Sequence, residues 1–308
     1  MAGSSRQRMA VNFSEEALYV YNSSRHLQLQ AKKGWVIFEL TGPRHTVIAR
    51  ISVNIKQSTA LSPVRAPFGS FEIYSRVSNA KLLKFVQFVE AGLAQKKIKQ
   101  LVIKSWPVLY QPKQAIQLYN VLVDKLQFKV SEEVCSIIPV DKSGLNVRMK
   151  ISERQKARKA EKMFSFSMCK PTEFKTIYDF ILSCRHERQQ TLSLSWKEMR
   201  KTISTLPKQF IFFKLATATD IAAAAIVIRV SDSIWYTFYY AHAATYNKVS
   251  PVVHLLECIY KYAANEKIKL IDLGTSMVHD KVNKSLLHFK ESVGAVTGSK
   301  FTFSKMYD

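Results

Sequence analysis

Apolar residues along the chain switch between the two-residue repeat of strands and the three-to-four-residue repeat of helices. In the first half, a helix is predicted over 78–96, where Leu82, Phe85, Val89 and Leu93 fall on one face behind a Ser or Asn cap. A second helix is predicted over 113–126. Strands are predicted over 34–40 and 46–55, near Phe71, over 99–105 and over 128–140.

The second half repeats this order of elements. Two helices are expected over 172–184 and 195–205, followed by three strands over 210–216, 221–230 and 234–241. The half closes with a helix over 251–266, a strand over 268–273, a helix over 281–293 and a strand over 299–305. Strands that alternate with helices imply βαβ crossovers and a mixed, partly parallel sheet in each half. The chain therefore reads as two similar α/β domains in tandem.

A basic stretch, MKISERQKARKAEK, joins the halves and favours a helix. We place the boundary beside it, with an N-terminal domain over 1–150 and a C-terminal domain over 151–308. Its crowded Lys and Arg residues fit a ridge that binds polyanions. They fit a solvated connecting helix as well, which is the usual role of a charge run.

Composition limits the possible classes of protein. The longest apolar stretch, Ile221 to Ile228, is much shorter than the roughly 20 residues of a membrane span. The first residues lack the apolar core of a signal peptide, so we expect a cytoplasmic protein without a membrane span. The four cysteines and seven histidines form no metal-ligand spacing, and we expect no metal. The oligomeric state stays open.

The net charge of +23, from 46 Lys and Arg against 23 Asp and Glu, is the unusual feature of the composition. A positive field attracts nucleic acid, nucleotide-linked substrates and phosphate-rich cofactors. Lysines on solvated helix faces produce the same count without any such partner.

Candidate chemistry lies in two segments near the C-terminus. Ser250 and Pro251 mark the start of a helix directly after a strand, and a helix start offers free N–H groups to an anion. The next segment, IKLIDLGTSMVHDKVNKSLLHFKESVGA, runs from a buried strand through a polar loop into a helix. Asp272, Thr275 and Ser276 follow that strand, at the end where open α/β sheets hold ligands. An Asp at a strand end is also a common loop cap.

These segments resemble the cofactor half of a GNAT acyltransferase. Asn283 and Gly294 match the Asn and Gly of that family's pattern, and Phe289, Lys290 and Gly294 are similar to the "FK…G" segment of Fem-type aminoacyl transferases. RQKARKAEK resembles the basic stretch that opens the second Fem domain. The resemblance implies an α/β protein of two tandem GNAT-like domains with mixed sheets flanked by helices. It also implies transfer of an acyl or aminoacyl group from acyl-CoA or aminoacyl-tRNA to an amine acceptor.

The resemblance also implies site residues. Lys290 and Asp272 are the expected catalytic residues: Lys290 stabilises the oxyanion, and Asp272 orients the acyl donor or the attacking amine. The expected donor-binding residues are Asn283, Ser250, Tyr246, Thr275 and Ser276. In the first domain, the rigid loop SPVRAPFGSFE carries Arg65, Phe68 and Gly69, which are expected to bind the acceptor.

Two departures separate the chain from these families. The glycine-containing pyrophosphate loop of typical GNAT proteins is missing, because 244–250 holds no glycine, and ordinary acetyl-CoA binding is therefore in question. The coiled-coil arm of some Fem proteins is missing too. The alternative is a non-catalytic basic protein that binds RNA or nucleotides on a degenerate GNAT fold, with tRNA as a possible partner in either case.

Overall fold

The computed structural model describes residues 6–10 and 17–307, which divide into two compact units. The first unit holds Met1–Glu133 together with Ser299–Asp308, and the second holds Val134–Gly298. The sequence placed the division near residue 150. By internal contacts it falls between Glu133 and Val134, and the last residues of the chain return to the first unit.

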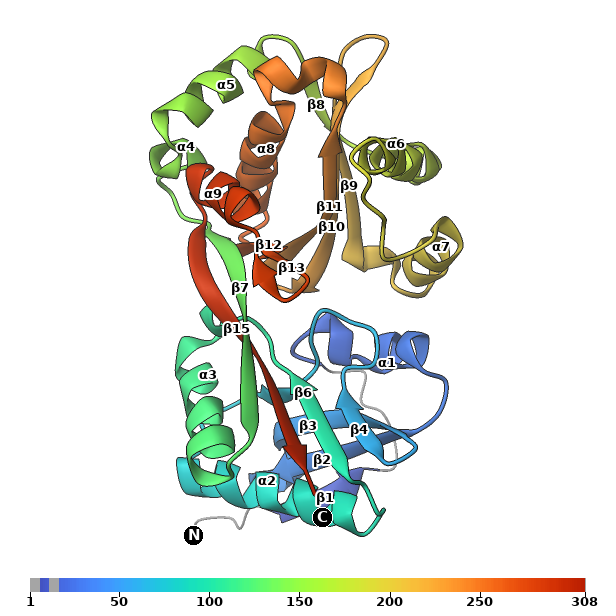
Figure 1. Ribbon diagram of the computed structural model, residues 1–308, viewed down its shortest axis with the longest axis vertical. Coiled ribbons are helices and arrows are strands. Elements are labelled where there is room, and N and C mark those ends of the chain that lie inside the picture. The colour runs from blue at the N-terminus through green and yellow to red at the C-terminus, as the bar shows by residue number, and fades with distance from the viewer. Residues whose placement is uncertain (1–5, 11–16, 308) are drawn as a thin grey trace. The chain divides into compact units, whose positions relative to one another are not determined.

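The first unit is a mixed sheet with helices packed on it (Figure 1). Its strands lie in the order β1-β2-β3-β4-β6-β15, and β5 pairs with β3. Strands β4 and β6 are parallel and are joined through helix α2, while the remaining pairs are antiparallel. The elements are β1 (Arg6–Ala10), α1 (Ser24–Gln30), β2 (Trp35–Thr41), β3 (Val47–Lys56), β4 (Thr59–Ser62), β5 (Phe71–Ile73), α2 (Asn79–Ala94), β6 (Gln100–Lys104), α3 (Pro112–Tyr119), which continues as a π-helix over Asn120–Lys125, β7 (Lys129–Pro139) and β15 (Val296–Met306).

The core of the first unit lies between this sheet and helix α2. Phe85 and Val89 of α2 are fully buried against Phe38 of β2 and Ile51 of β3. Phe303 of the C-terminal strand β15 joins the same cluster. Ser78 caps α2 through its side-chain oxygen, which accepts from the N–H of Lys81, as the sequence predicted.

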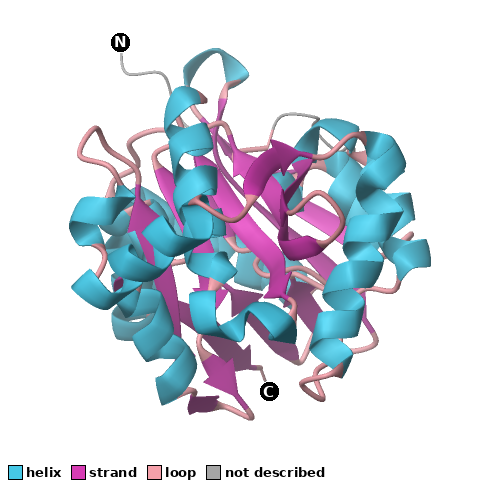
Figure 2. Cartoon of the chain, turned by 90° about the horizontal axis from the view of Figure 1, so that it is seen from above, coloured by secondary structure: helices cyan, strands magenta, loops and turns pink. Residues whose placement is uncertain are grey.

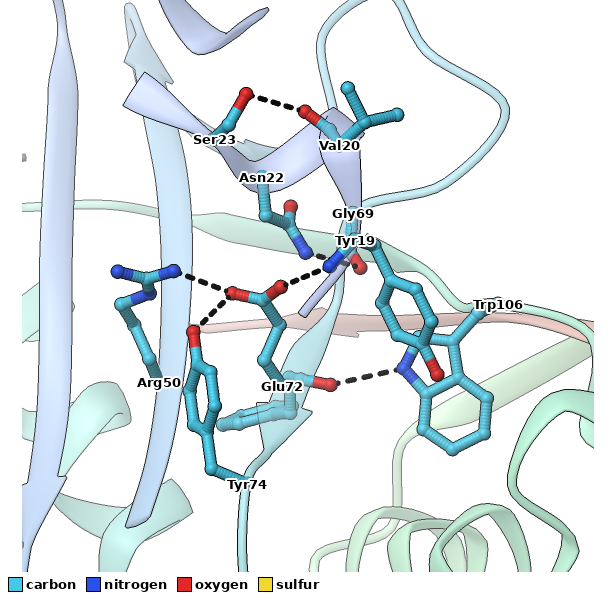
Figure 3. A network of polar contacts seen from close by, with 10 residues as sticks. Tyr19, Val20, Asn22, Ser23, Arg50, Gly69, Glu72, Tyr74 and Trp106 are labelled. Atoms are coloured by element: carbon cyan, nitrogen blue, oxygen red, sulfur yellow. Dashed lines mark hydrogen bonds and ion pairs between the residues drawn. The ribbon is translucent and has the colours of Figure 1, made fainter. Parts of the chain in front are cut away.

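A buried charge network holds the sheet to the N-terminal segment (Figure 3). Arg50 of β3 lies opposite Glu72 of β5 in the strand register and donates to it over 2.8 Å. The carboxylate of Glu72 also accepts from the hydroxyl of Tyr74 and from the backbone N–H of Tyr19. Arg50 and Glu72 are 3% and 1% exposed, so each charge depends on the other for compensation.

The second unit has strand order β7-β12-β11-β10-β9-β8 with helices on both faces. In Figure 1 the strands β9 to β11 lie between helices α8 and α6, and both helices contact these strands. The helices and strands are distinguished by colour in Figure 2, with helices in cyan and strands in magenta. The elements are α4 (Leu145–Arg148), α5 (Ile151–Glu161), β8 (Ser165–Met168), α6 (Phe174–His186), α7 (Trp196–Thr205), β9 (Phe210–Ala216), β10 (Ile221–Ser231), β11 (Ile234–His242), η7 (Ala244–Val249), α8 (Pro251–Asn265), β12 (Leu270–Thr275), β13 (Met277–Val278), β14 (Lys281–Val282) and α9 (Lys284–Ser292).

The crossover in the second unit runs from β11 through α8 to β12, and β11 and β12 are parallel. Leu255 and Ile259 of α8 pack on Trp235 of β11 and Phe213 of β9 in one buried cluster. The predicted α/β class with mixed, partly parallel sheets is therefore confirmed. The helix predicted over 281–293 is present as α9 but begins at Lys284, because Lys281 and Val282 form the second strand of a hairpin whose turn residues, His279 and Asp280, take positive φ angles.

Candidate functional site

A pocket of about 430 Å³ opens in the second unit, a size that suits a small ligand. The parallel strands β11 and β12 are paired over three residues each: Ile234–Tyr236 of β11 lies beside Leu270–Asp272 of β12. Beyond that point the paired register ends, and the pocket is lined by the later residues of both strands. This is the carboxyl end of two parallel strands, where open α/β sheets commonly hold ligands.

Lys290 of α9 forms one wall of the pocket and is only 2% exposed. Its Nζ donates to the carbonyl oxygens of Gly274 and Thr275, each at 2.9 Å. Burial lowers the pKa of Lys290 to about 8, although the charges of Asp272 and Cys135 act in the opposite direction. An ammonium group has three N–H donors, so the two carbonyls leave one donor for a ligand.

The carbonyls that hold Lys290 sit at an irregularity of β12. The register of β12 with β7 shifts between Asp272 and Thr275, and Gly274 lies there with φ +75°. The carboxylate of Asp272 accepts from the N–H of Gly274 over 2.6 Å, which fixes this turn. A Cβ at Gly274 would lie 3.2 Å from the ring of Tyr236. Glycine is favoured here for both its φ angle and its size.

Arg185 in the last turn of α6 and Arg188, two residues beyond its end, line the same pocket. Arg185 donates through Nη2 to the carbonyl of Tyr240, and Arg188 donates to the carbonyl of His242, both at 3.2 Å. The Nε atom of Arg185 is buried and has no hydrogen-bond partner among the residues that the structure describes. A buried donor without a partner is uncommon in folded proteins and is consistent with a missing acceptor, supplied by a ligand or by water.

The lining of the pocket is cationic. Arg185, Arg188 and Lys290 contribute to it, and within residues 6–10 and 17–307 no Asp or Glu does. Tyr240 also lines it, and burial raises the pKa of its hydroxyl to about 12 even though Arg185 acts to lower it. The imidazole of His242 forms a hydrogen bond of 2.8 Å with the side chain of Asn247. Burial lowers the pKa of His242, so its ring is uncharged at neutral pH. The electrostatics of the pocket favour a ligand that carries a carboxylate or a phosphate.

Helix α8 begins at the same pocket. Pro251 is its first residue and Ser250 is the cap, as predicted, but Ser250 has a left-handed backbone, with φ 45°, and its side chain makes no capping bond. Ser250 and Val252 line the pocket. The helix start therefore faces the same space as the arginines.

The structure gathers some of the predicted site residues and separates others. Lys290, Thr275 and Ser250 line the pocket, and Asp272 acts on it through Gly274. Asn283 is the cap of α9, where its side chain accepts from the N–H of Leu286. Tyr246 packs edge-on against Phe164 with ring centroids 5.0 Å apart. Ser276 is fully buried, and its hydroxyl has no partner within the described part of the chain.

The residues predicted to bind an acceptor lie in the first unit. Arg65 is exposed, whereas Phe68 is 2% exposed and packs against Tyr19, Tyr21 and Tyr110. Gly69 is buried, and a Cβ there would lie 2.6 Å from the hydroxyl oxygen of Ser62. Phe68 and Gly69 shape the interior beneath this loop. Contact of any of the three residues with an acceptor stays a prediction.

Sequence reasoning missed Arg185 and Arg188. The helix was predicted to end at Cys184, although the RHER run directly after it marked a basic turn at the end of an amphipathic helix. Nothing in the local sequence indicated that β11 lies beside that turn.

No family model matches this sequence, and no curated protein matches it either. Solved structures do match. Among them, FemX superposes with a TM-score of 0.71 at 13% identity, over 94% of this chain and 92% of FemX. L-PGS from Bacillus licheniformis gives a TM-score of 0.57 at 12% identity, over 90% of this chain and 85% of that one. A tandem GNAT protein from the clavulanic acid biosynthesis pathway gives 0.51 at 9% identity, over 98% of both chains.

These likenesses define the class of fold: the chain is an α/β protein of two tandem GNAT-like domains. More particularly, it is FemX-like in fold along most of its length. The resemblance inferred from the FK…G segment and the basic stretch is thereby confirmed at the level of fold.

Two further observations concern metals and membranes. Within 6–10 and 17–307, no group of three or more His, Cys, Asp or Glu side chains is arranged to hold a metal ion. None of the helices in that part of the chain combines the length and apolarity required to cross a bilayer.

Proposed function

We propose that the chain is an acyltransferase that moves an acyl or aminoacyl group from a thioester or tRNA-ester donor to an amine. The observation that carries this proposal is the buried ammonium group of Lys290, which is held by two carbonyls at the wall of a cationic pocket. Such a group is positioned before the reaction and gains most when negative charge develops beside it.

The reaction that this geometry supports proceeds in two steps. The amine nitrogen attacks the carbonyl carbon of the donor, a C–N bond forms, and the carbonyl electrons move to oxygen as an oxyanion. The free N–H of Lys290 donates to that oxyanion. The intermediate then collapses, the bond from carbon to the donor's sulfur or oxygen breaks, and the proton lost by the amine passes to the leaving group.

The remaining pocket residues orient the substrates. Arg185 and Arg188, held by the carbonyls of β11, bind a carboxylate or phosphate of a substrate. The N–H groups of Ser250 and Val253 already donate to carbonyls and Pro251 has none, so the start of α8 favours the same kind of anion through the positive end of the helix dipole. Asp272 is a positioning residue, since its carboxylate fixes the Gly274 carbonyl that holds Lys290.

The test measures cleavage of the donor that depends on an amine. Acetyl-CoA, longer acyl-CoAs and a mixture of aminoacyl-tRNAs are each incubated with a panel of amines, and free thiol or deacylated tRNA is quantified. Lys290→Met is expected to lower kcat about 100-fold to 1,000-fold, the cost of removing one oxyanion donor. Lys284→Met, which replaces an exposed lysine of the same helix, is the matched control.

Circular dichroism and thermal unfolding establish that both variants are folded. Turnover that survives Lys290→Met would remove Lys290 from the mechanism. Absence of turnover with every donor class would favour the non-catalytic alternative, a basic protein that binds RNA or nucleotides.

A further inference from the structure

One donor of Arg185 is left without an acceptor, although Arg185 lines the pocket. Nη1 of Arg185 donates to the side-chain oxygen of Gln190, and Nη2 donates to the carbonyl of Tyr240 over 3.2 Å. Nε is buried and has no partner among the residues that the structure describes. The two bonds fix the plane of the guanidinium group, and the Nε side of that plane stays available to a ligand.

The edge of the guanidinium group that holds Nε and Nη2 suits a carboxylate. Two parallel N–H groups of an arginine match the two oxygens of a carboxylate. Nη2 has two hydrogens, and the carbonyl of Tyr240 takes one of them, so the other is left for a ligand. A phosphate group has a further oxygen and a larger charge, which a single edge of one guanidinium leaves uncompensated.

The carbonyls that hold the two buried cations, Tyr240 for the arginine and Gly274 for the lysine, are close along the strand direction. Tyr236 and Asp272 are partners in the register of β11 and β12. Tyr240 lies four residues beyond this pair in β11, and Gly274 lies two residues beyond it in β12. The two anchors are therefore offset by two residues, about 7 Å along the strands. A ligand that reaches both cations needs only a few bonds between its carboxylate and its reacting end.

The charges of the lining determine the protonation state of that reacting end. Arg185, Arg188 and Lys290 are cations, and no Asp or Glu within residues 6–10 and 17–307 lines the pocket with them. The carboxylate of Asp272, which acts on Lys290, accepts from the N–H of Gly274 and is not part of the lining. An ammonium group beside three cations is disfavoured, so an amine binds here in its neutral form. The neutral amine is the form that attacks a carbonyl.

We propose that the amine acceptor is a free amino acid, or a similarly small amino carboxylic acid, whose carboxylate is bound by Arg185 and whose amine lies beside Lys290. The proposal deepens the proposed function, on which it rests for the reaction. The carboxylate gives the ligand the negative charge that the lining favours, and it holds the amine close to an acyl group polarised by Lys290. A pocket of about 430 Å³ has room for a ligand of this size.

The test is a binding measurement that needs no acyl donor. The common amino acids are screened against the full chain by isothermal titration calorimetry, each at millimolar concentration. The best ligand is then compared with its amide, which keeps the amine but lacks the carboxylate. Inorganic phosphate is titrated against the bound amino acid as the competing anion.

In the wild type, the amide is expected to bind about 10-fold or more weakly than the acid, a comparison that depends on no variant. Arg185→Gln should weaken binding of the acid by a similar factor, about 10-fold or more. Arg185→Lys should lose nearly as much, because lysine keeps the charge but not the planar pair of donors. Arg200→Gln, which removes an exposed arginine of α7, is the matched control and should change the affinity less than about 2-fold.

Four outcomes would overturn the inference: no binding of any amino acid to the wild type, equal affinity for acid and amide, equal affinities of Arg185→Gln and Arg200→Gln, or tighter binding of phosphate than of every amino acid. The proposed function is tested separately. Amino-acid binding that depends on Arg185, without turnover of any donor, would refute the transferase proposal alone. Turnover only with amines that lack a carboxylate would refute the present inference and leave the transferase proposal in place.

Discussion

The ammonium nitrogen of Lys290 lies 2.9 Å from the carbonyl oxygen of Gly274. The backbone N–H of Gly274 donates in turn to the carboxylate of Asp272, which fixes the conformation of Gly274. A backbone turn thus determines where a buried cation sits. Such a cation is stable in its pocket only while both carbonyls are in place, because burial penalises its charged form. The position of Lys290 therefore depends on Asp272, Gly274 and Thr275 of β12 as much as on α9.

The pH dependence of turnover should report the charge of Lys290. Its pKa of about 8 means that the ammonium form dominates below that pH and is lost above it. If Lys290 donates to the oxyanion, kcat should fall as pH rises through about 8. Lys290→Arg keeps its charge throughout this range, so the falling limb should disappear even though the absolute rate is lower. A limb that persists in Lys290→Arg would belong to another group.

Gly274→Ala should damage both stability and activity. A positive φ is unfavourable for alanine, and the new methyl group would press on the ring of Tyr236. We expect a loss of about 1 kcal/mol or more in the free energy of unfolding and a lower kcat, because the carbonyl that holds Lys290 moves. Urea unfolding and steady-state kinetics measure the two effects. An unchanged kcat would show that the Gly274 carbonyl is not needed to position Lys290.

Arg185→Gln and Arg188→Gln should raise KM for the substrate that carries the anion, by about 10-fold or more, and affect kcat less. The arginines bind a part of the substrate that does not react, so their contribution is similar in the ground and transition states. Lys197→Gln, at an exposed position of α7, is the control for a lost positive charge. If KM stays at its wild-type value in both arginine variants, the anion lies elsewhere.

Glu72→Gln should destabilise the first unit. It removes the negative charge that compensates Arg50, and both side chains are buried (Figure 3). Breaking a buried pair on one side typically costs about 3 to 5 kcal/mol. Tyr74→Phe removes only the hydroxyl that donates to Glu72 and should cost about 1 kcal/mol. Denaturant unfolding gives both values, with the exposed Asp124→Asn as a control expected to stay within about 0.5 kcal/mol.

Local signals were sufficient for most elements. The apolar repeat and the Ser78 cap predicted α2, and the Ser250-Pro251 pair predicted the start of α8. Short elements without such a repeat were missed, among them α1 and β4. Loop composition suggested Phe68 as a residue that binds the acceptor, and only the structure showed that Phe68 is buried against three tyrosines.

The sequence alone determined the class of fold and the order of most strands and helices along the chain, and it made Lys290 a candidate, because these depend on short-range periodicity and on a local motif. Only the tertiary structure decided that the C-terminal strand completes the first unit and that Arg185 and Arg188 share a pocket with Lys290. Both facts depend on contacts between residues about 100 or more positions apart, since α6 precedes α9 and β6 precedes β15 by that distance. Such contacts are fixed by burial and strand pairing, which a local pattern does not encode.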